Sequence, residues 1–187
     1  MVDQATKDMR KRFVKIGAGF IVVIGVISIA IFWWFSSTNL VLVAVRGDSM
    51  EPTLHSGQNL ILSQSEKIAN GEIIVFPKPS NWGTAEEAQP ELIKRVIAIP
   101  GDTLSYEDGK LLVNGELVFD LENESYNCGL QDGYTHKLGS SDFFAMGDNH
   151  TVSLDSLRIL CDSETDPSFA FVSLDSAVAY GTIERII

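Results

Sequence analysis

The chain has 187 residues, 45% of them hydrophobic, and its 14 basic and 25 acidic residues give a formal net charge of −11. This length predicts one ordinary domain plus a short additional segment. The acidic balance argues against a nucleic-acid partner, because proteins that bind nucleic acids present a basic surface to the phosphates.

The first predicted element is a transmembrane helix over residues 16–35. This segment, IGAGFIVVIGVISIAIFWWF, has no charged residue. About 20 such residues, rising 1.5 Å each, cover the roughly 30 Å hydrocarbon core of a bilayer. A buried core helix and a cleaved signal sequence are the alternatives. The run is longer than the apolar core of a signal peptide, about 7–15 residues, and no A-x-A-like site closely follows it. A retained helix in the lipid bilayer is therefore expected.

The charges on either side of this helix predict its orientation. Residues 1–15 carry five basic and two acidic residues, whereas no charge follows the helix until Arg46. Trp33 and Trp34 occupy the place of an interfacial aromatic belt. Since basic flanks stay in the cytoplasm, we expect a cytoplasmic N-terminus over 1–15 and an exported domain over 36–187. Cys128 and Cys161 then lie where disulfides persist, which favours a disulfide over two free buried thiols.

The exported segment is predicted to be mostly β, a compact and mainly antiparallel domain. Short β-rich runs bounded by turn residues recur along it, and helical periodicity is weak. Asp108-Gly109 and Asn114-Gly115 are typical of tight hairpin turns. Residues 77–91 are expected to form a connecting loop. The predicted strands cover residues 40–45, 59–64, 72–77, 92–99, 103–107, 110–115, 142–147 and 177–186.

The segment GDSMEPTLHSG (47–57) places Ser49 at a turn directly after an apolar run. Gly, Asp, Ser and Pro are common in ordinary loops, so the segment alone indicates no function. A serine hydroxyl becomes a nucleophile only when a base takes its proton. His55, His136 and His150 lie in polar segments without supporting context, which disfavours a Ser-His-Asp triad.

Lys94 is the other candidate base. It lies in the apolar run ELIKRVIAIPGD, where strand alternation places it on the face of Leu92 and Val96, with Arg95 on the opposite face. Burial would lower the pKa of the lysine and allow it to act as a neutral base. The alternative is an edge lysine whose ammonium reaches water. No His, Cys, Asp or Glu cluster has metal-ligand spacing, so neither a metal nor another cofactor is expected.

Four segments follow the apolar run in the order GDSMEPTL, GEIIVFP, IKRVIAIPGD and MGDNHTVSLDS. Together they resemble the bacterial type I signal peptidases, membrane-bound Ser/Lys endopeptidases that remove signal peptides. The resemblance covers the helix and nearly all of the exported domain. It implies signal-peptide-bearing preproteins as partners, cleavage after small residues at −3 and −1, and the bacterial cytoplasmic (inner) membrane as the location. It leaves the oligomeric state open.

The resemblance also implies individual roles. Ser49 matches the nucleophile, Lys94 the general base, and Met50 the methionine that packs beside the nucleophile. Ser153 matches a serine that orients the lysine, and residues 147–149 match a loop that holds the site together. Arg95 and Asp155 match a structural ion pair.

A substrate is expected to bind as an added strand between residues 43–47 and 91–94. The backbone N–H of Ser49 would face the oxyanion. The apolar walls of the substrate pockets would be Val43, Val45, Met50, Leu54, Leu92 and Ile93.

Two positions depart from the family pattern. Gly47 stands where some relatives have a hydroxyl residue as a second oxyanion donor. Leu157 stands at the arginine of the usual S-x-D-S-R segment, with Arg158 one residue later, which leaves the ion pairs around Asp155 open.

These departures keep other functions open. A dedicated peptidase that matures a pilin or secretion-system substrate is one alternative. A non-catalytic, membrane-tethered binding domain is another, although a scaffold gains nothing from burying a lysine. A self-cleaving repressor with the same dyad is disfavoured by the apolar helix and by the lack of a basic DNA-binding domain.

Overall fold

The computed structural model describes residues 19, 21–33, 40–64, 68–83, 91–122, 126–162, 164–174 and 181–186. Contacts divide the chain into two units, residues 1–39 and residues 40–187. The predicted cytoplasmic segment 1–15 lies outside the described residues, as do residues 84–90 of the expected loop 77–91.

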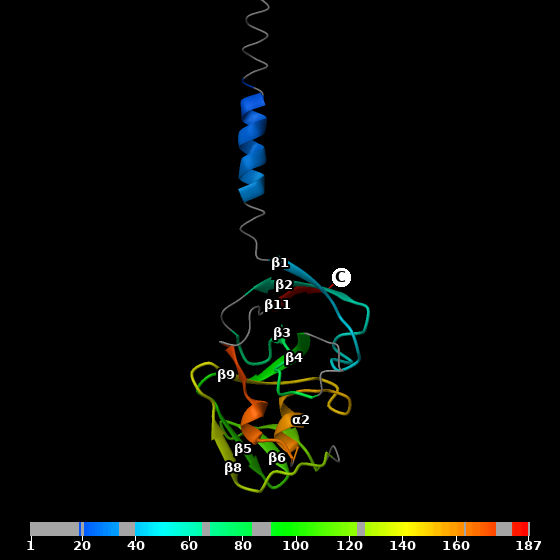
Figure 1. The fold of residues 1–187 in the computed structure, drawn as a ribbon, viewed down its shortest axis with the longest axis vertical. Coiled ribbons are helices and arrows are strands. Elements are labelled where there is room, and N and C mark those ends of the chain that lie inside the picture. The colour runs from blue at the N-terminus through cyan, green and yellow to red at the C-terminus, as the bar shows by residue number, and fades with distance from the viewer. Residues whose placement is uncertain are drawn as a thin grey trace, which may run out of the picture. The chain divides into compact units, whose positions relative to one another are not determined.

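The first unit contains a helix over residues 21–33, drawn in blue in Figure 1. Its apolar side chains are exposed, as Ile21 at 72% and Phe32 at 70% illustrate. No helix among the described residues is both long enough and apolar enough to cross a membrane. The predicted span over 16–35 lies partly outside these residues, so it stays a prediction.

The second unit is mostly β and antiparallel, as the sequence predicted. Its larger sheet has seven described strands in the order β1-β2-β11-β3-β4-β9-β10, and β1, β2 and β11 lie side by side at one end (Figure 1). The strands are β1 Leu40–Ala44, β2 Asn59–Gln64, β3 Ile73–Pro77, β4 Glu91–Ala98, β9 Asp142–Met146, β10 Val172–Ser173 and β11 Gly181–Ile186.

A second, four-stranded sheet has the order β7-β6-β5-β8. Both predicted hairpin turns are confirmed, with positive φ at Asp108 (47°) and Gly109 (71°) and at Asn114 (54°) and Gly115 (81°). Two of its strands, β7 and β8, were not predicted from the sequence. The strands are β5 Thr103–Glu107, β6 Lys110–Val113, β7 Glu116–Asp120 and β8 Tyr134–Lys137.

Two short helices were also not predicted from the sequence: α2 (Ser156–Cys161) and the 3-10 helix η1 (Pro167–Ala170). Asp155 caps α2, because its side chain accepts a hydrogen bond from the backbone N–H of Arg158 at 3.0 Å. A disulfide joins Cys128 to Cys161, the last residue of α2, in agreement with the pairing that the sequence favoured.

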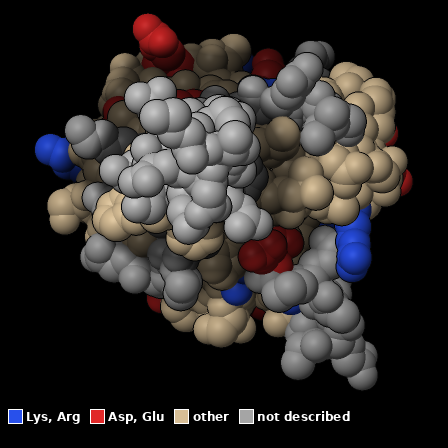
Figure 2. Space-filling model, turned by 90° about the horizontal axis from the view of Figure 1, so that it is seen from above, with Lys and Arg blue, Asp and Glu red and all other residues tan. Residues whose placement is uncertain are grey.

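The buried apolar side chains form two clusters. The larger one lies between the two sheets and the short helices and includes Phe76, Trp82, Phe143 and Phe144. The smaller one packs against β1, β2 and β3 and consists of Val45, Met50, Leu54, Leu60, Leu62 and Val75. On the face shown in Figure 2, the described Lys and Arg side chains are few and lie apart from one another.

Candidate active site

Ser49 lies in a tight turn that begins shortly after β1. Backbone bonds from Val45 N to Gln58 O (2.8 Å) and from Gly57 N to Val45 O (2.9 Å) hold the intervening segment in place. Gly47 has a φ of +81°, a left-handed conformation that favours glycine. The turn then closes through a 2.9 Å bond from Leu54 N to Met50 O. The serine is therefore presented by a backbone that is fixed on both sides.

Lys94 reaches this serine from β4. Its Nζ donates to Ser49 Oγ at 2.8 Å and to the carbonyl oxygen of Ile93 at 2.9 Å. The residue is 2% exposed, and β4 alternates between buried and partly buried positions, as predicted for this strand. In the described part of the chain, no carboxylate lies within ion-pair distance of its ammonium group. The edge alternative, with the ammonium in water, is therefore wrong.

Burial lowers the pKa of Lys94 from 10.5 to about 8, although the negative charges of Asp155 and Asp148 act in the opposite direction. A pKa near 8 leaves roughly a tenth of the lysine neutral at pH 7. The site thus holds an amine that can accept a proton, 2.8 Å from a hydroxyl that can give one.

The loop over residues 147–149 touches both Ser49 and Ser153. The N–H of Asn149 donates to the carbonyl oxygen of Ser49 at 3.0 Å. A Cβ added at Gly147 would collide with the Ser153 hydroxyl and with the Ser49 carbonyl oxygen, so a side chain there would force these segments apart. Ser153 is fully buried, and its Oγ has no hydrogen-bond partner among the described residues. The structure therefore shows no hydrogen bond between this hydroxyl and Lys94. The orienting role expected for Ser153 stays a prediction.

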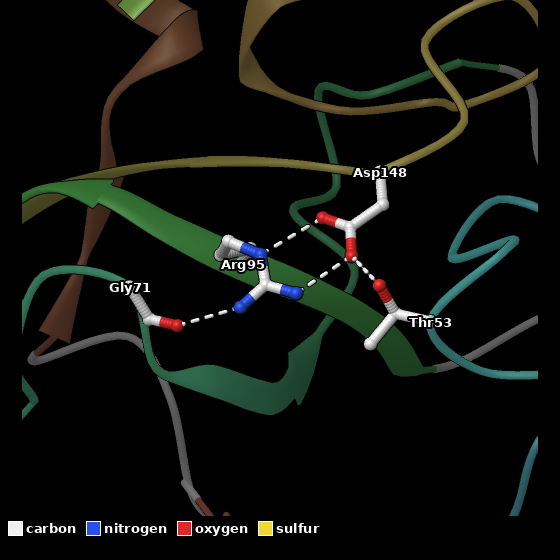
Figure 3. Close-up of polar contacts among 4 residues, drawn as sticks. All are labelled: Thr53, Gly71, Arg95 and Asp148. Atoms are coloured by element: carbon white, nitrogen blue, oxygen red, sulfur yellow. Dashed lines mark hydrogen bonds and ion pairs between the residues drawn. The ribbon is translucent and has the colours of Figure 1, made fainter.

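Arg95, on the opposite face of β4, does not pair with Asp155. Figure 3 shows it bound to Asp148, with Nε donating to Oδ1 at 2.9 Å and Nη2 to Oδ2 at 2.7 Å. Nη1 donates to the carbonyl oxygen of Gly71 at 2.8 Å, and Thr53 Oγ1 donates to Asp148 Oδ2 at 2.5 Å. Asp148 therefore ties the turn that carries Ser49 to the strand that carries Lys94.

Asp155 does not bind Arg95 as Asp148 does. It is 2% exposed, and its carboxylate caps α2. Besides Arg158 N, it accepts a 2.8 Å bond from Gly147 N. Leu157, at the family's arginine position, is 1% exposed in the larger core cluster, whereas Arg158 is exposed. The placement of Leu157 and Arg158 was not predicted from the sequence, because α2 was not predicted and this helix sets the direction of both side chains.

A cleft of about 290 Å³ adjoins Ser49 and Lys94. It runs between residues 42–47 and residues 91–94, the two segments expected to bind substrate. Leu54 does not line it, since this side chain is fully buried in the smaller core cluster. The other five predicted wall residues do line it: Val43, Val45, Met50, Leu92 and Ile93.

The histidines lie elsewhere. His55 Nδ1 lies 2.6 Å from a carboxylate oxygen of Glu51, His136 stacks on Phe171, and His150 packs on Phe119. Within the described ranges, no group of three or more His, Cys, Asp or Glu side chains is placed to hold a metal ion.

The family model for signal peptidase, peptidase S26, matches residues 12–179. The chain belongs to the S26 signal peptidase family. This confirms the family indicated by the four sequence segments.

Several curated relatives of this S26 chain are named signal peptidase I. The one from Bacillus amyloliquefaciens is 31% identical over 128 residues, which cover 60% of this chain and 62% of the relative. One from Streptococcus pneumoniae is 32% identical over 105 residues, 56% of this chain and 45% of the relative. Signal peptidase I V of Bacillus subtilis is 28% identical over 148 residues, 71% of this chain and 83% of the relative.

Among solved structures, a signal peptidase I from Enterococcus faecalis V583 matches 60% of this chain and 95% of its own, with 26% identity and a TM-score of 0.34.

Proposed function

We propose that this chain is a membrane-bound serine endopeptidase that removes signal peptides from exported preproteins, cleaving after small residues at −3 and −1. Ser49 would be the nucleophile and Lys94 the general base. The observation that carries the proposal is the 2.8 Å contact between a buried lysine, with its pKa lowered to about 8, and a serine at the edge of a cleft. We further propose that the protein lies in the bacterial cytoplasmic membrane with its catalytic domain on the outer side.

The proposed chemistry begins with neutral Lys94. Its Nζ takes the proton of Ser49 Oγ as the oxygen attacks the carbonyl carbon of the scissile peptide bond. The Ser49 N–H would donate to the resulting oxyanion, a contribution typically of about 3–4 kcal/mol. The Lys94 ammonium then protonates the leaving amine, which frees the mature protein. Water attacks the acyl-enzyme with Lys94 again as the base, which releases the signal peptide and restores the serine.

Strand pairing around the cleft supports an extended substrate. β1 pairs with β2 on one side, and residues 91–95 of β4 pair with β3, whereas β9 pairs with β4 only from Arg95 onward. Among the described strands, the other edge of each segment is unpaired, and both segments line the cleft. A peptide inserted there would gain main-chain hydrogen bonds from both sides. The small volume and apolar walls suit small residues at −1 and −3.

The test is cleavage of a preprotein by the full-length chain in detergent. Ser49→Ala and Lys94→Ala should each lower kcat/KM by at least about a thousandfold, because nucleophile and base act as one unit. Ser140→Ala and Lys110→Ala, which alter exposed side chains of the same types, are the matched controls and should cleave normally. Full activity in Lys94→Ala would refute the proposed base, and intact preprotein with wild type would refute the proposed function.

A further inference from the structure

Arg46 is a permanent cation at the cleft. Three of the residues lining the cleft carry ionisable side chains: Arg46, Glu91 and Lys94. Lys94 must be neutral to act in the proposed chemistry, whereas an arginine stays charged at any physiological pH. The segment that holds Arg46, residues 36–187, carries nine basic and 23 acidic residues, so a cation here is unusual for this surface.

The guanidinium of Arg46 is also available for binding. Its side chain is exposed, and among the described residues it has no hydrogen bond or ion pair. Arg95 offers the contrast, since all of its guanidinium nitrogens donate to Asp148 or Gly71. Arg46 therefore contributes no polar contact to the described fold, and its charge is free to meet a substrate.

The backbone predicts which substrate residue it would meet. Val43 and Val45 point toward the protein interior, whereas Ala44 and Arg46 are exposed. A substrate strand beside this segment would alternate in the same way. With the residues at −1 and −3 directed into the cleft, the residue at −2 would share the outer face with Arg46 and lie across from it.

We infer that Arg46 is a specificity-determining residue that favours an acidic side chain at position −2 of the substrate. The inference rests on the proposed function. A guanidinium binds a carboxylate through charge-assisted and often paired hydrogen bonds. A basic residue at −2 would instead be repelled. Glu91, also exposed, lies three residues before Lys94 at the start of β4, so it would face a position farther from the scissile bond.

The test uses three peptides with Ala at −3 and −1 and with Glu, Gln or Lys at −2, cleaved by the full-length chain. Wild type should cleave the Glu peptide with a kcat/KM about two- to fivefold above that of the Lys peptide, as for an exposed cross-strand charge pair. Arg46→Gln should remove this preference and Arg46→Glu should reverse it. Glu91→Gln, which changes the other charged residue of the cleft rim, should retain it. The preference should also shrink at high salt.

An unchanged Glu-over-Lys preference in Arg46→Glu would overturn the inference, as would equal cleavage of the two peptides by wild type. Binding of the same three peptides to Ser49→Ala, followed by fluorescence anisotropy, separates the two proposals. If no peptide is cleaved but binding still follows the charge of the varied residue and depends on Arg46, the peptidase proposal fails, whereas Arg46 stands as the residue that selects the charge of a bound peptide. If cleavage proceeds without regard to the −2 charge, only the assignment of Arg46 fails.

Discussion

Lys94 and Arg95 are neighbours on β4, and the two faces of the strand give their charges opposite environments. Lys94 is 2% exposed, has no carboxylate partner among the described residues, and has its pKa lowered to about 8 by burial. The Arg95 side chain is 30% exposed and binds Asp148, and this hydrogen bond raises its pKa. Alternation along one strand thus separates a candidate base from an anchoring cation.

The charges of Lys94 and Arg95 should contribute to the stability of the domain with opposite signs. Desolvation disfavours the charged form of Lys94, so the folded state is penalised while the lysine is protonated. Burial alone would raise the pKa of Asp148, but hydrogen bonds from Arg95 and Thr53 hold it below its usual value. We therefore expect removal of the Lys94 charge to stabilise the domain and removal of the Arg95 charge to destabilise it.

Among the variants compared for stability, Lys94→Met should show the largest effect. Below pH 8, Lys94 is protonated in both the folded and the unfolded wild type, so the folded state bears the full cost of burying the charged lysine. Between pH 8 and 10.5 the unfolded chain holds a proton that the folded chain has lost, so wild-type stability rises with pH. At pH 7 the variant should therefore be more stable than wild type by about 3 kcal/mol, taking about 1.4 kcal/mol per pH unit. Urea unfolding at pH 7 and pH 10 measures this, and a variant less stable than wild type at pH 7 would contradict it.

The pH dependence of cleavage tests whether buried Lys94 is the base. Only neutral Lys94 can accept the serine proton, so kcat/KM should rise with pH through an ionisation near the lysine pKa of about 8. Between pH 6 and pH 8 the neutral fraction grows on the order of fiftyfold, and the rate should follow. A rate that rises instead near pH 6.5, and is lost on substitution of one of the histidines, would identify histidine as the base.

Arg95→Met should have the smallest effect and the opposite sign to Lys94→Met. It leaves the Asp148 carboxylate, whose side chain is 17% exposed, without its guanidinium partner. Loss of such a partner costs about 1–3 kcal/mol. Urea unfolding at pH 7 should show this loss, whereas Arg158→Met, at an exposed arginine, should stay within about 0.5 kcal/mol of wild type. If Arg95→Met proved as stable as Arg158→Met, Arg95 would not anchor the domain. The contrast between the two faces of β4 would then not hold.

Much of the fold was predictable because local signals and the final structure agree. The Asp-Gly and Asn-Gly turns place their hairpins correctly, and apolar runs mark β1 to β6 and β9. β8 has the sequence YTHK, which is too polar to be recognised, and α2 is too short to show helical periodicity.

For the candidate site, alternation places Lys94 on the face of Leu92 and Val96 but leaves open whether the lysine is buried or reaches water. The resemblance to the signal peptidases favours a buried base beside an apolar cleft, and the structure shows the lysine to be 2% exposed. The partner of Arg95 was not predictable, because the choice between Asp148 and Asp155 depends on how a distant loop crosses β4. The burial of Leu54 was missed for a similar reason: a side chain in the same turn as Ser49 can point into the core just as well as into the cleft.

Trp82 gives the second unit an optical reporter. Its ring is fully buried against Phe76, and its indole N–H donates to the carbonyl oxygen of Phe169 at 2.7 Å. Trp33, by contrast, is 74% exposed in the first unit. An indole in an apolar environment emits at shorter wavelength than one in water. The fluorescence of Trp82 should therefore move to the red as the β domain unfolds, so its unfolding can be followed without an added label.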